Sequence, residues 1–151
     1  MVFAYTTLPN APPRPYLDVV LRNGFRTAPP VIALVDSGAD RLVFPTEMAI
    51  EFLGIDLAGA RAWNFYGTGG VLQKAKLADV RMAVLKQEDG SHAFEVSTTC
   101  AFCDTFAFPV SGGLLGQEGF FSKFKVNFLQ PYKYFEIDLW PAALVHPIQS
   151  R

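Results

Sequence analysis

The sequence has few cysteines and few histidines. Its 151 residues include only Cys100 and Cys103, which form a Cys-x-x-Cys pair, together with His92 and His146. A structural zinc site needs four such ligands, and neither histidine stands at a zinc-motif spacing. A redox pair usually opens a helix, whereas this pair follows a strand-like stretch. We therefore interpret both cysteines as buried or half-buried free thiols, and we expect no metal and no other cofactor.

An excess of one charge and apolar segments of membrane length are also lacking. The chain carries 13 Lys and Arg against 14 Asp and Glu, a formal net charge of −1. It has no basic field that would bind the phosphates of nucleic acid. The longest apolar runs, such as residues 31–35, are far shorter than the roughly 20 residues of a membrane helix. Residues 1–5 have neither the positive nor the long apolar part of a signal peptide. We expect a cytoplasmic protein with no nucleic-acid or membrane partner.

Phenylalanine, glycine and proline are abundant. There are 14 phenylalanines, 12 glycines and 11 prolines, and half of all residues are hydrophobic. A chain of this length and hydrophobicity can bury one sizeable core. Short alternating runs between turn residues favour strands over helices. The sequence therefore predicts one mostly β domain.

Several strands and turns can be placed. Residues 16–21 lead into the turn Asn23-Gly24, and their expected partner is the strand 31–35, which is apolar on both faces. Apolar residues alternate with polar ones over 124–128 and again over 135–139, on either side of a Gln130-Pro131 turn. Both patterns predict antiparallel pairs.

One helix and one long hairpin are expected in the middle of the chain. The helix is predicted over about 46–53, with Thr46 as its cap and Gly54 as its end. After it, residues 62–66 and 71–82 flank the glycine-rich tip 67–70, which predicts a hairpin. The tip is not a phosphate-binding loop, because neither Gly-Lys-Ser/Thr nor a helix follows it.

Asp36 is the most informative polar residue. It directly follows the five apolar residues of the strand 31–35, and a carboxylate at the end of a buried strand is costly unless something stabilises it. Ser37 and Gly38 supply a hydroxyl, backbone N–H groups and a position without a side chain. Taken alone, Asp-Ser-Gly is more often a simple turn.

The surroundings of Asp36 resemble those of the catalytic aspartate in retroviral-type (retropepsin-like) aspartic proteases. Residues 31–40, Val-Ile-Ala-Leu-Val-Asp-Ser-Gly-Ala-Asp, resemble the catalytic strand and loop of that family. Residues 113–116, Gly-Leu-Leu-Gly, resemble its hydrophobic-hydrophobic-Gly element, and the residues that follow look like its cellular and bacterial members. The hairpin between these two motifs resembles the flap. Three motifs in the family's order, over residues 17–139, are more specific than any one of them.

The resemblance implies a single-lobe acid protease barrel with a flap hairpin, the inserted helix over about 46–53 and a short C-terminal helix over about 116–122. It implies that Asp36 is catalytic and that Ser37 and Gly38 support the active-site loop. Two further groups of residues follow from it, one for substrate binding (Ala39, Asp40, Tyr66, Gly67, Thr68, Gly69 and Gly70) and one beneath the active site (Leu114, Leu115 and Gly116). Trp63, Phe65, Tyr66 and Leu72 either line apolar subsites or simply pack the hairpin.

Aspartic proteolysis needs two carboxylates, and this chain offers one suitable loop. Asp89-Gly90-Ser91 has neither the residue order nor the preceding buried strand. The chemistry therefore predicts a homodimer that cleaves extended peptides. Residues 1–15 are expected to be an N-terminal extension with a role at the dimer interface, residues 16–140 the protease domain and residues 141–151 a C-terminal tail.

Gln117 departs from the family pattern. Retroviral enzymes often have an arginine at this position, which pairs with the aspartate equivalent to Asp40. Either Arg14, Arg41 or another cation replaces it, or Asp40 is bound more loosely. The main alternative function is a dimerisation or peptide-binding module of the same fold with little or no proteolysis, because a fold alone does not establish an activity. An unrelated β-barrel binding protein is less favoured.

Overall fold

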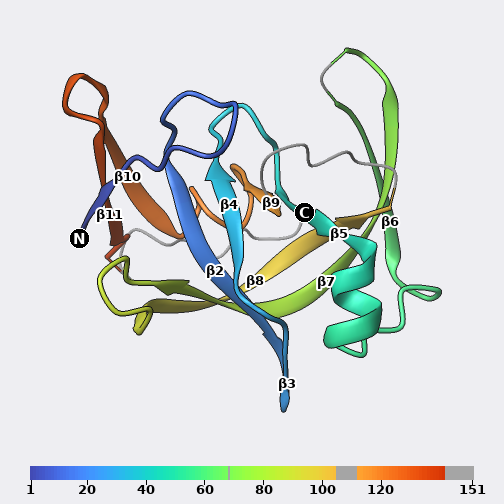
Figure 1. Cartoon of the computed structure of the whole chain (residues 1–151). Coiled ribbons are helices and arrows are strands. Elements are labelled where there is room, and N and C mark those ends of the chain that lie inside the picture. The colour runs from blue at the N-terminus through green and yellow to red at the C-terminus, as the bar shows by residue number, and fades with distance from the viewer. Residues whose placement is uncertain (68, 105–111, 142–151) are drawn as a thin grey trace.

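The computed structural model describes residues 1–67, 69–104 and 112–141, and most of them are in strands (Figure 1). This confirms the mostly β prediction. Thr68 of the hairpin tip and residues 142–151 of the expected tail lie outside the described residues. The elements are β1 (Val2–Ala4), β2 (Tyr16–Asn23), β3 (Arg26–Thr27), β4 (Val31–Val35), β5 (Leu42–Pro45), η1 (Met48–Phe52), β6 (Arg61–Tyr66), β7 (Leu72–Leu85), β8 (His92–Cys103), β9 (Gly113–Leu115), β10 (Phe124–Leu129), η2 (Gln130–Tyr132) and β11 (Tyr134–Leu139).

The larger sheet closes on itself. Its strand order is β3-β2-β4-β9-β5-β8-β7-β6, and β2 also pairs with β7. This extra pairing joins β2, β4, β9, β5, β8 and β7 into a ring of hydrogen-bonded neighbours, so that these strands form a barrel. Closure leaves fewer unpaired strand edges in the sheet.

The barrel encloses the main hydrophobic core. Its strands alternate, with one set of side chains directed inward, as the period of two in a strand requires. On β2 the buried inward residues are Leu17, Val19 and Leu21, and on β7 they include Met82 and Val84. Because several strands alternate in this way, their inward apolar side chains meet in one interior.

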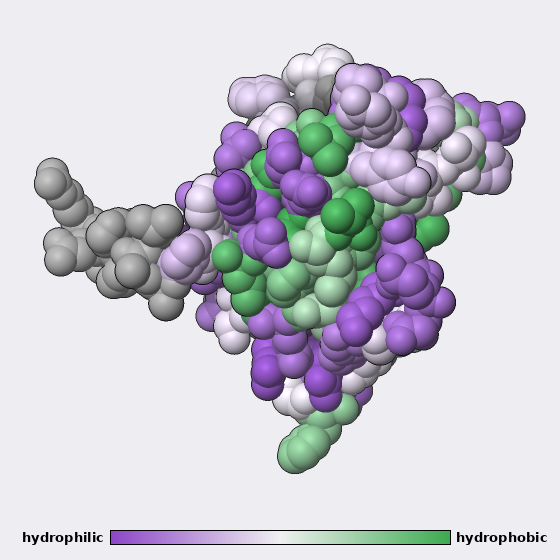
Figure 2. Space-filling model, turned by 90° about the vertical axis from the view of Figure 1, so that its left-hand side faces the viewer, coloured by the Kyte–Doolittle hydropathy of each residue, from purple (hydrophilic) through white to green (hydrophobic). Residues whose placement is uncertain are grey.

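A second, three-stranded sheet has the order β1-β11-β10. Phe3, Phe135 and Ile137 of this sheet are buried in the main core, and the Phe3 and Phe135 rings stack at 5.6 Å. The predicted antiparallel pair of residues 124–128 and 135–139 is confirmed. Figure 2 views the molecule from the side on which this sheet lies in Figure 1, and hydrophobic residues gather at the centre of that face. β1 pairs with β11 of its own chain. The role of residues 1–15 at a dimer interface stays a prediction.

The predicted first hairpin is also present. β2 turns at Asn23-Gly24, where Gly24 has a φ of +58°, and then pairs antiparallel with both β3 and β4. A left-handed φ favours glycine because a Cβ would be strained there. β4 lies between β2 and β9, with Ala33 and Val35 buried, which confirms that it is an interior strand.

The helical segment within 46–53 is short. Residues 46–47 are α-helical and Met48–Phe52 have π-helical hydrogen bonding, and the Leu53 N–H donates to the Met48 carbonyl at 3.2 Å. The cap position falls on Glu47 and has no side-chain cap hydrogen bond, so the predicted cap at Thr46 is wrong. Gly54 has a φ of +61° and follows the last turn, as expected. In the described part of the chain, no helix is both long enough and apolar enough to cross a membrane.

The predicted helix over 116–122 is wrong, because residues 117–123 form turns and an isolated β-bridge. Glu118 pairs with Arg41 in a parallel bridge, and its carbonyl accepts the Leu42 N–H at 3.3 Å. Gly119 has a φ of +101°, which lies outside the helical region. The backbone here bonds to a distant loop, and it therefore cannot also form a regular helix.

Candidate active site

β4 places Asp36 at the end of an interior barrel strand. The Asp36 N–H donates to the Leu115 carbonyl of β9 at 3.0 Å. Its side chain is half-buried, and Oδ1 accepts the Gly38 N–H at 2.9 Å. Among the described residues, no salt bridge involves Asp36. The tripeptide is therefore a turn, and at the same time it holds a carboxylate that carries no cationic partner in this part of the chain.

β9 lies directly beside β4 and supports the loop that contains Asp36. The two strands run parallel, with Leu34 opposite Leu114 and Val35 opposite Leu115. At the end of β9, a Cβ on Gly116 would overlap the carbonyl oxygens of Ala39 and Arg41. Only glycine allows the two backbones to approach this closely. The structure thus brings the predicted residues Leu114, Leu115 and Gly116 next to the Asp36 loop.

Gln117 and Glu118 hold the other side of the same loop. The Gln117 N–H donates to the Ala39 carbonyl and the Glu118 N–H donates to the Asp40 carbonyl, both at 2.8 Å. The Gln117 side chain adds a third contact, because its Nε2 donates to the Ser37 carbonyl at 2.6 Å. Residues 37–40 are therefore bound by three hydrogen bonds from the segment that follows β9.

The sequence did not predict this role for Gln117. The available signal was an amide side chain directly after the Gly-Leu-Leu-Gly element. Such a side chain can donate a hydrogen bond to a backbone carbonyl, whereas an arginine at this position would pair with a carboxylate. Neither Arg14 nor Arg41 takes over the expected pairing. No salt bridge between described residues involves Asp40, which is exposed.

The glycine-tipped hairpin is present between β6 and β7. Its strands pair from Arg61 opposite Leu77 to Tyr66 opposite Leu72, and the Gly67 N–H donates to the Val71 carbonyl at 3.1 Å. Gly69 and Gly70 have φ values of +89° and +73°. In Figure 1 the hairpin extends away from the barrel. Tyr66 at the tip is 74% exposed, and Thr68 lies outside the described residues.

The stem of this hairpin packs against the Asp36 loop side of the barrel. The Trp63 and Phe65 rings stack with centroids 4.6 Å apart, and the Arg41 guanidinium lies 5.3 Å from the Trp63 centroid. Both rings pack on a second apolar cluster that includes Val43 and Leu77. Trp63 and Phe65 therefore pack the hairpin stem, whereas Tyr66 and Leu72 are exposed near the tip.

The two cysteines are buried thiols that form no disulfide, as predicted. They are three residues apart on β8, so their side chains leave opposite faces of the strand. Cys100 lies in the main core and Cys103 in the second cluster. Burial, with a smaller contribution from the charge of Asp79, raises the pKa of the Cys100 thiol well above its usual range. In the described part of the chain, no three His, Cys, Asp or Glu side chains are grouped so that they could hold a metal ion.

Comparison with known proteins gives little beyond this geometry. No protein-family model matches the chain. No curated protein matches it either. Among solved structures, the chain is similar to the EIAV protease complexed with the inhibitor HBY-793, at 24% sequence identity over 74% of this chain and 88% of that chain, with a TM-score of 0.39. A likeness at this level carries no argument about function, which is therefore inferred from the residues of the site.

Proposed function

We propose that the protein is a homodimeric aspartic endopeptidase, in which two Asp36 carboxylates, one from each subunit, activate a water molecule. The main supporting observation is the way the Asp36 loop is held. Asp36 is half-buried and directly follows an interior strand, and Gln117 and Glu118 bind the next residues through three hydrogen bonds. A catalytic carboxylate requires this kind of fixed backbone, because small displacements of reacting groups are costly to catalysis.

Two carboxylates that face each other share a proton, because both cannot ionise at close range. In the proposed dimer the ionised Asp36 takes a proton from water while its protonated copy polarises the scissile carbonyl. The water attacks the carbonyl carbon, and the proton that it loses finally reaches the leaving amine, so that one peptide bond is replaced by a carboxyl group and an amino group.

A second chain would complete the site. Ser37 and Gly38 are exposed in the single chain, and they follow the half-buried Asp36 directly. A two-fold axis near this loop would bring the two Asp36 residues together, and isologous dimers are the commonest oligomers. By resemblance, the Ser37 hydroxyl would then bond to the backbone of the partner subunit. Since β1 is already paired with β11, the dimer would not need to exchange this terminal strand.

The substrate would lie extended between the Asp36 loop and the tip of the β6–β7 hairpin. Ala39 and Asp40 would contact its main chain from one side, and Tyr66 with Gly67, Thr68, Gly69 and Gly70 would cover it from the other. Tyr66 is exposed, and no described residue comes within 4 Å of a Cβ added at Gly69 or Gly70, which supports a tip that can make such contacts.

The direct test replaces Asp36 by Asn and follows the cleavage of a mixed peptide library between about pH 3 and 8. The matched control is Asp56→Asn, because Asp56 is exposed and accepts a local hydrogen bond from the Ala58 N–H at 2.9 Å. We expect cleavage to fall by about 10³-fold or more in the first variant and to stay unchanged in the second.

Cleavage that survives Asp36→Asn would disprove the mechanism. If the wild-type chain forms dimers but cleaves nothing across this pH range, the result would favour the peptide-binding or dimerisation module instead.

A further inference from the structure

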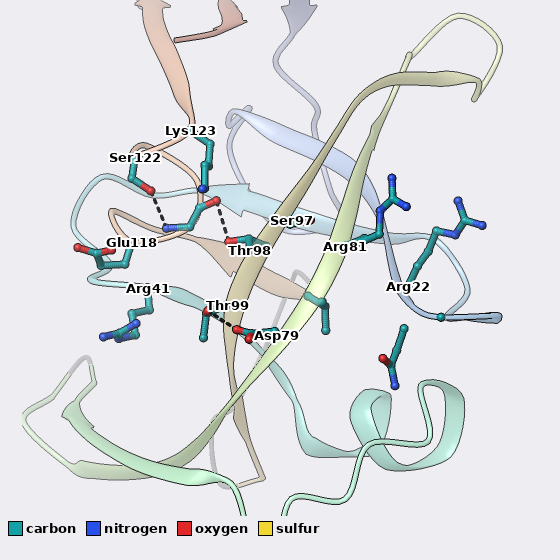
Figure 3. Close-up of a pocket in the computed structure, with 14 residues that line it drawn as sticks. Arg22, Arg41, Asp79, Arg81, Ser97, Thr98, Thr99, Glu118, Ser122 and Lys123 are labelled. Carbon is teal, nitrogen blue, oxygen red and sulfur yellow. Dashed lines mark hydrogen bonds between the residues drawn. The ribbon is translucent and has the colours of Figure 1, made fainter. Parts of the chain in front are cut away.

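The structure also contains a cavity of about 620 Å³ (Figure 3). Its walls come from the turn after β2, the middle of β7 and β8, Arg41, and the turns over residues 118–123. Arg41, at the end of the Asp36 loop, and Glu118, whose N–H binds the Asp40 carbonyl, both line it, whereas Asp36 itself does not. Its volume falls within the range of small-molecule sites.

Four positively charged side chains reach this cavity, namely Arg22, Arg41, Arg81 and Lys123. In Figure 3, Arg22 and Arg81 lie toward one end, and Lys123 and Arg41 lie toward the other. Arg22 stands opposite Arg81 on the neighbouring strand, which explains why the first two are adjacent. Like charges directly opposite each other are destabilising unless an anion lies between or beside them.

Glu95 supplies one anion beside the paired Arg22 and Arg81. Its carboxylate lies 3.4 Å from Arg22 Nη1 and 3.1 Å from Arg81 Nη2, so that one negative charge serves two guanidinium groups. Lys123 is half-buried, and none of the salt bridges between described residues includes it. Each side of the cavity therefore keeps cationic N–H groups that a ligand can bind.

The remaining polar side chains of the cavity are hydroxyls, two acids and the amide of Asn23, which donates to the Leu53 carbonyl at 2.9 Å. Asp79 accepts the Thr99 hydroxyl at 2.6 Å, the Thr98 hydroxyl donates to the Gly119 carbonyl at 3.1 Å, and Ser122 Oγ accepts the Gly119 N–H at 3.0 Å. Asp79 and Glu118 offset two of the four positive charges, and they can accept hydrogen bonds from hydroxyl groups of a ligand. The lining thus suits a ligand that carries anionic groups and hydroxyls together.

We propose that this cavity binds a compact polyanion, a small molecule with phosphate or carboxylate groups on a hydroxyl-bearing carbon frame. Arginine and lysine bind such anions through short, charge-assisted hydrogen bonds. An uncharged or apolar ligand would leave Lys123 without an anionic partner among the described residues. Binding here does not require the proposed proteolysis, because Asp36 does not line the cavity, although Arg41 and Glu118 of its lining adjoin the Asp36 loop.

The test measures binding by isothermal titration calorimetry at low salt with three probes, namely fructose 1,6-bisphosphate, citrate and uncharged fructose. We expect saturable binding of at least one anionic probe and none of fructose. Arg81→Gln and Lys123→Gln should each weaken it by about tenfold, the usual worth of one charge-assisted contact. The matched controls are Arg61→Gln and Lys125→Gln, which remove the same charges from exposed positions on β6 and β10 outside the cavity. These should leave the affinity unchanged.

The two anionic probes also distinguish phosphate from carboxylate as the preferred group. Amide chemical shifts of the wild-type chain give a second readout that does not depend on any variant, and we expect them to move at Ser97, Thr98 and Gly119. The proposal fails if neither anion binds, if fructose binds equally well, if the control variants weaken binding as much as the cavity variants, or if the shifts cluster elsewhere.

Discussion

Gly116 is the residue on which the approach of β9 to the Asp36 loop depends most directly. Its missing side chain lets the backbone of Ala39 and Arg41 come close. We expect Gly116→Ala to lower the free energy of unfolding by about 2–4 kcal/mol, because carbonyl groups held in a barrel cannot move aside cheaply. Urea denaturation measures this loss.

The control for that experiment is Gly59→Ala. Within the part of the chain that the structure describes, an added Cβ at Gly59 meets nothing within 4 Å, and Gly59 has no left-handed φ. This variant should keep the wild-type stability to within about 0.5 kcal/mol. Equal losses in both variants would mean that the close approach at Gly116 is not what makes glycine necessary.

Gln117 acts on the same loop through its side chain. Gln117→Ala removes the bond to the Ser37 carbonyl, which should cost about 1 kcal/mol of stability. If the proposed activity is correct, kcat for peptide cleavage should fall by about tenfold or more, because the loop that carries Asp36 is then less fixed.

Gln87→Ala is the matched control for this second prediction. The Gln87 side chain also bonds to backbone, with two hydrogen bonds of 2.9 Å to Ala4. These bonds hold the N-terminal strand β1 and not the Asp36 loop. It should lower stability by a similar amount and leave kcat unchanged. A fall in kcat in both variants would assign the effect to general loss of stability.

At the scale of elements, the β6–β7 hairpin can be compared with the turn that joins β7 to β8. Gly70 and Gly90 have φ values of +73° and +70°, and an added Cβ at either would meet no atom of the described residues within 4 Å. Replacing either by Ala should therefore cost a similar backbone strain of about 1 kcal/mol. Only Gly70→Ala should lower kcat/KM for peptides, since only its hairpin is proposed to cover the substrate.

Thermal unfolding and peptide kinetics on the two variants separate these effects. The proposed covering role of the hairpin is wrong if both variants keep full kcat/KM, or if both lose it equally. A loss confined to Gly90→Ala would point to the opposite end of β7.

Some predictions of helices and strands from the sequence were confirmed and others were wrong, for a physical reason. The strands at 31–35, 124–128 and 135–139 could be located because alternation and flanking turns are local signals. The helix expected at 116–122 does not form, because the Glu118 backbone bonds to Arg41 and Leu42 from a distant part of the chain. No local pattern reports such a partner.

At the scale of the whole molecule, a single chain forms a closed barrel but supplies only one of the two carboxylates of the proposed catalytic site. A mixing experiment tests this. When wild type is combined with an equal amount of Asp36→Asn and allowed to exchange subunits, random pairing leaves about a quarter of the dimers with two carboxylates. Activity should therefore fall to about half of that expected from the wild-type chain present.

Sedimentation in parallel should show dimers at the working concentration. Activity that stays proportional to the amount of wild-type chain would mean that each subunit works alone. A monomer that cleaves peptides at high concentration would contradict the dimer in the same way.

The sequence by itself determined the mostly β character, the first hairpin with its glycine, the burial of both cysteines and the position of Asp36 after an interior strand. Each of these depends on alternation, turn chemistry or hydrophobicity within a few residues. Only the tertiary structure decided the closure of the barrel through β2 and β7, the contact of Gln117 with Ser37, and the cationic cavity. Those features join residues far apart in the chain, and which distant strands become neighbours is settled by packing and pairing of the whole molecule.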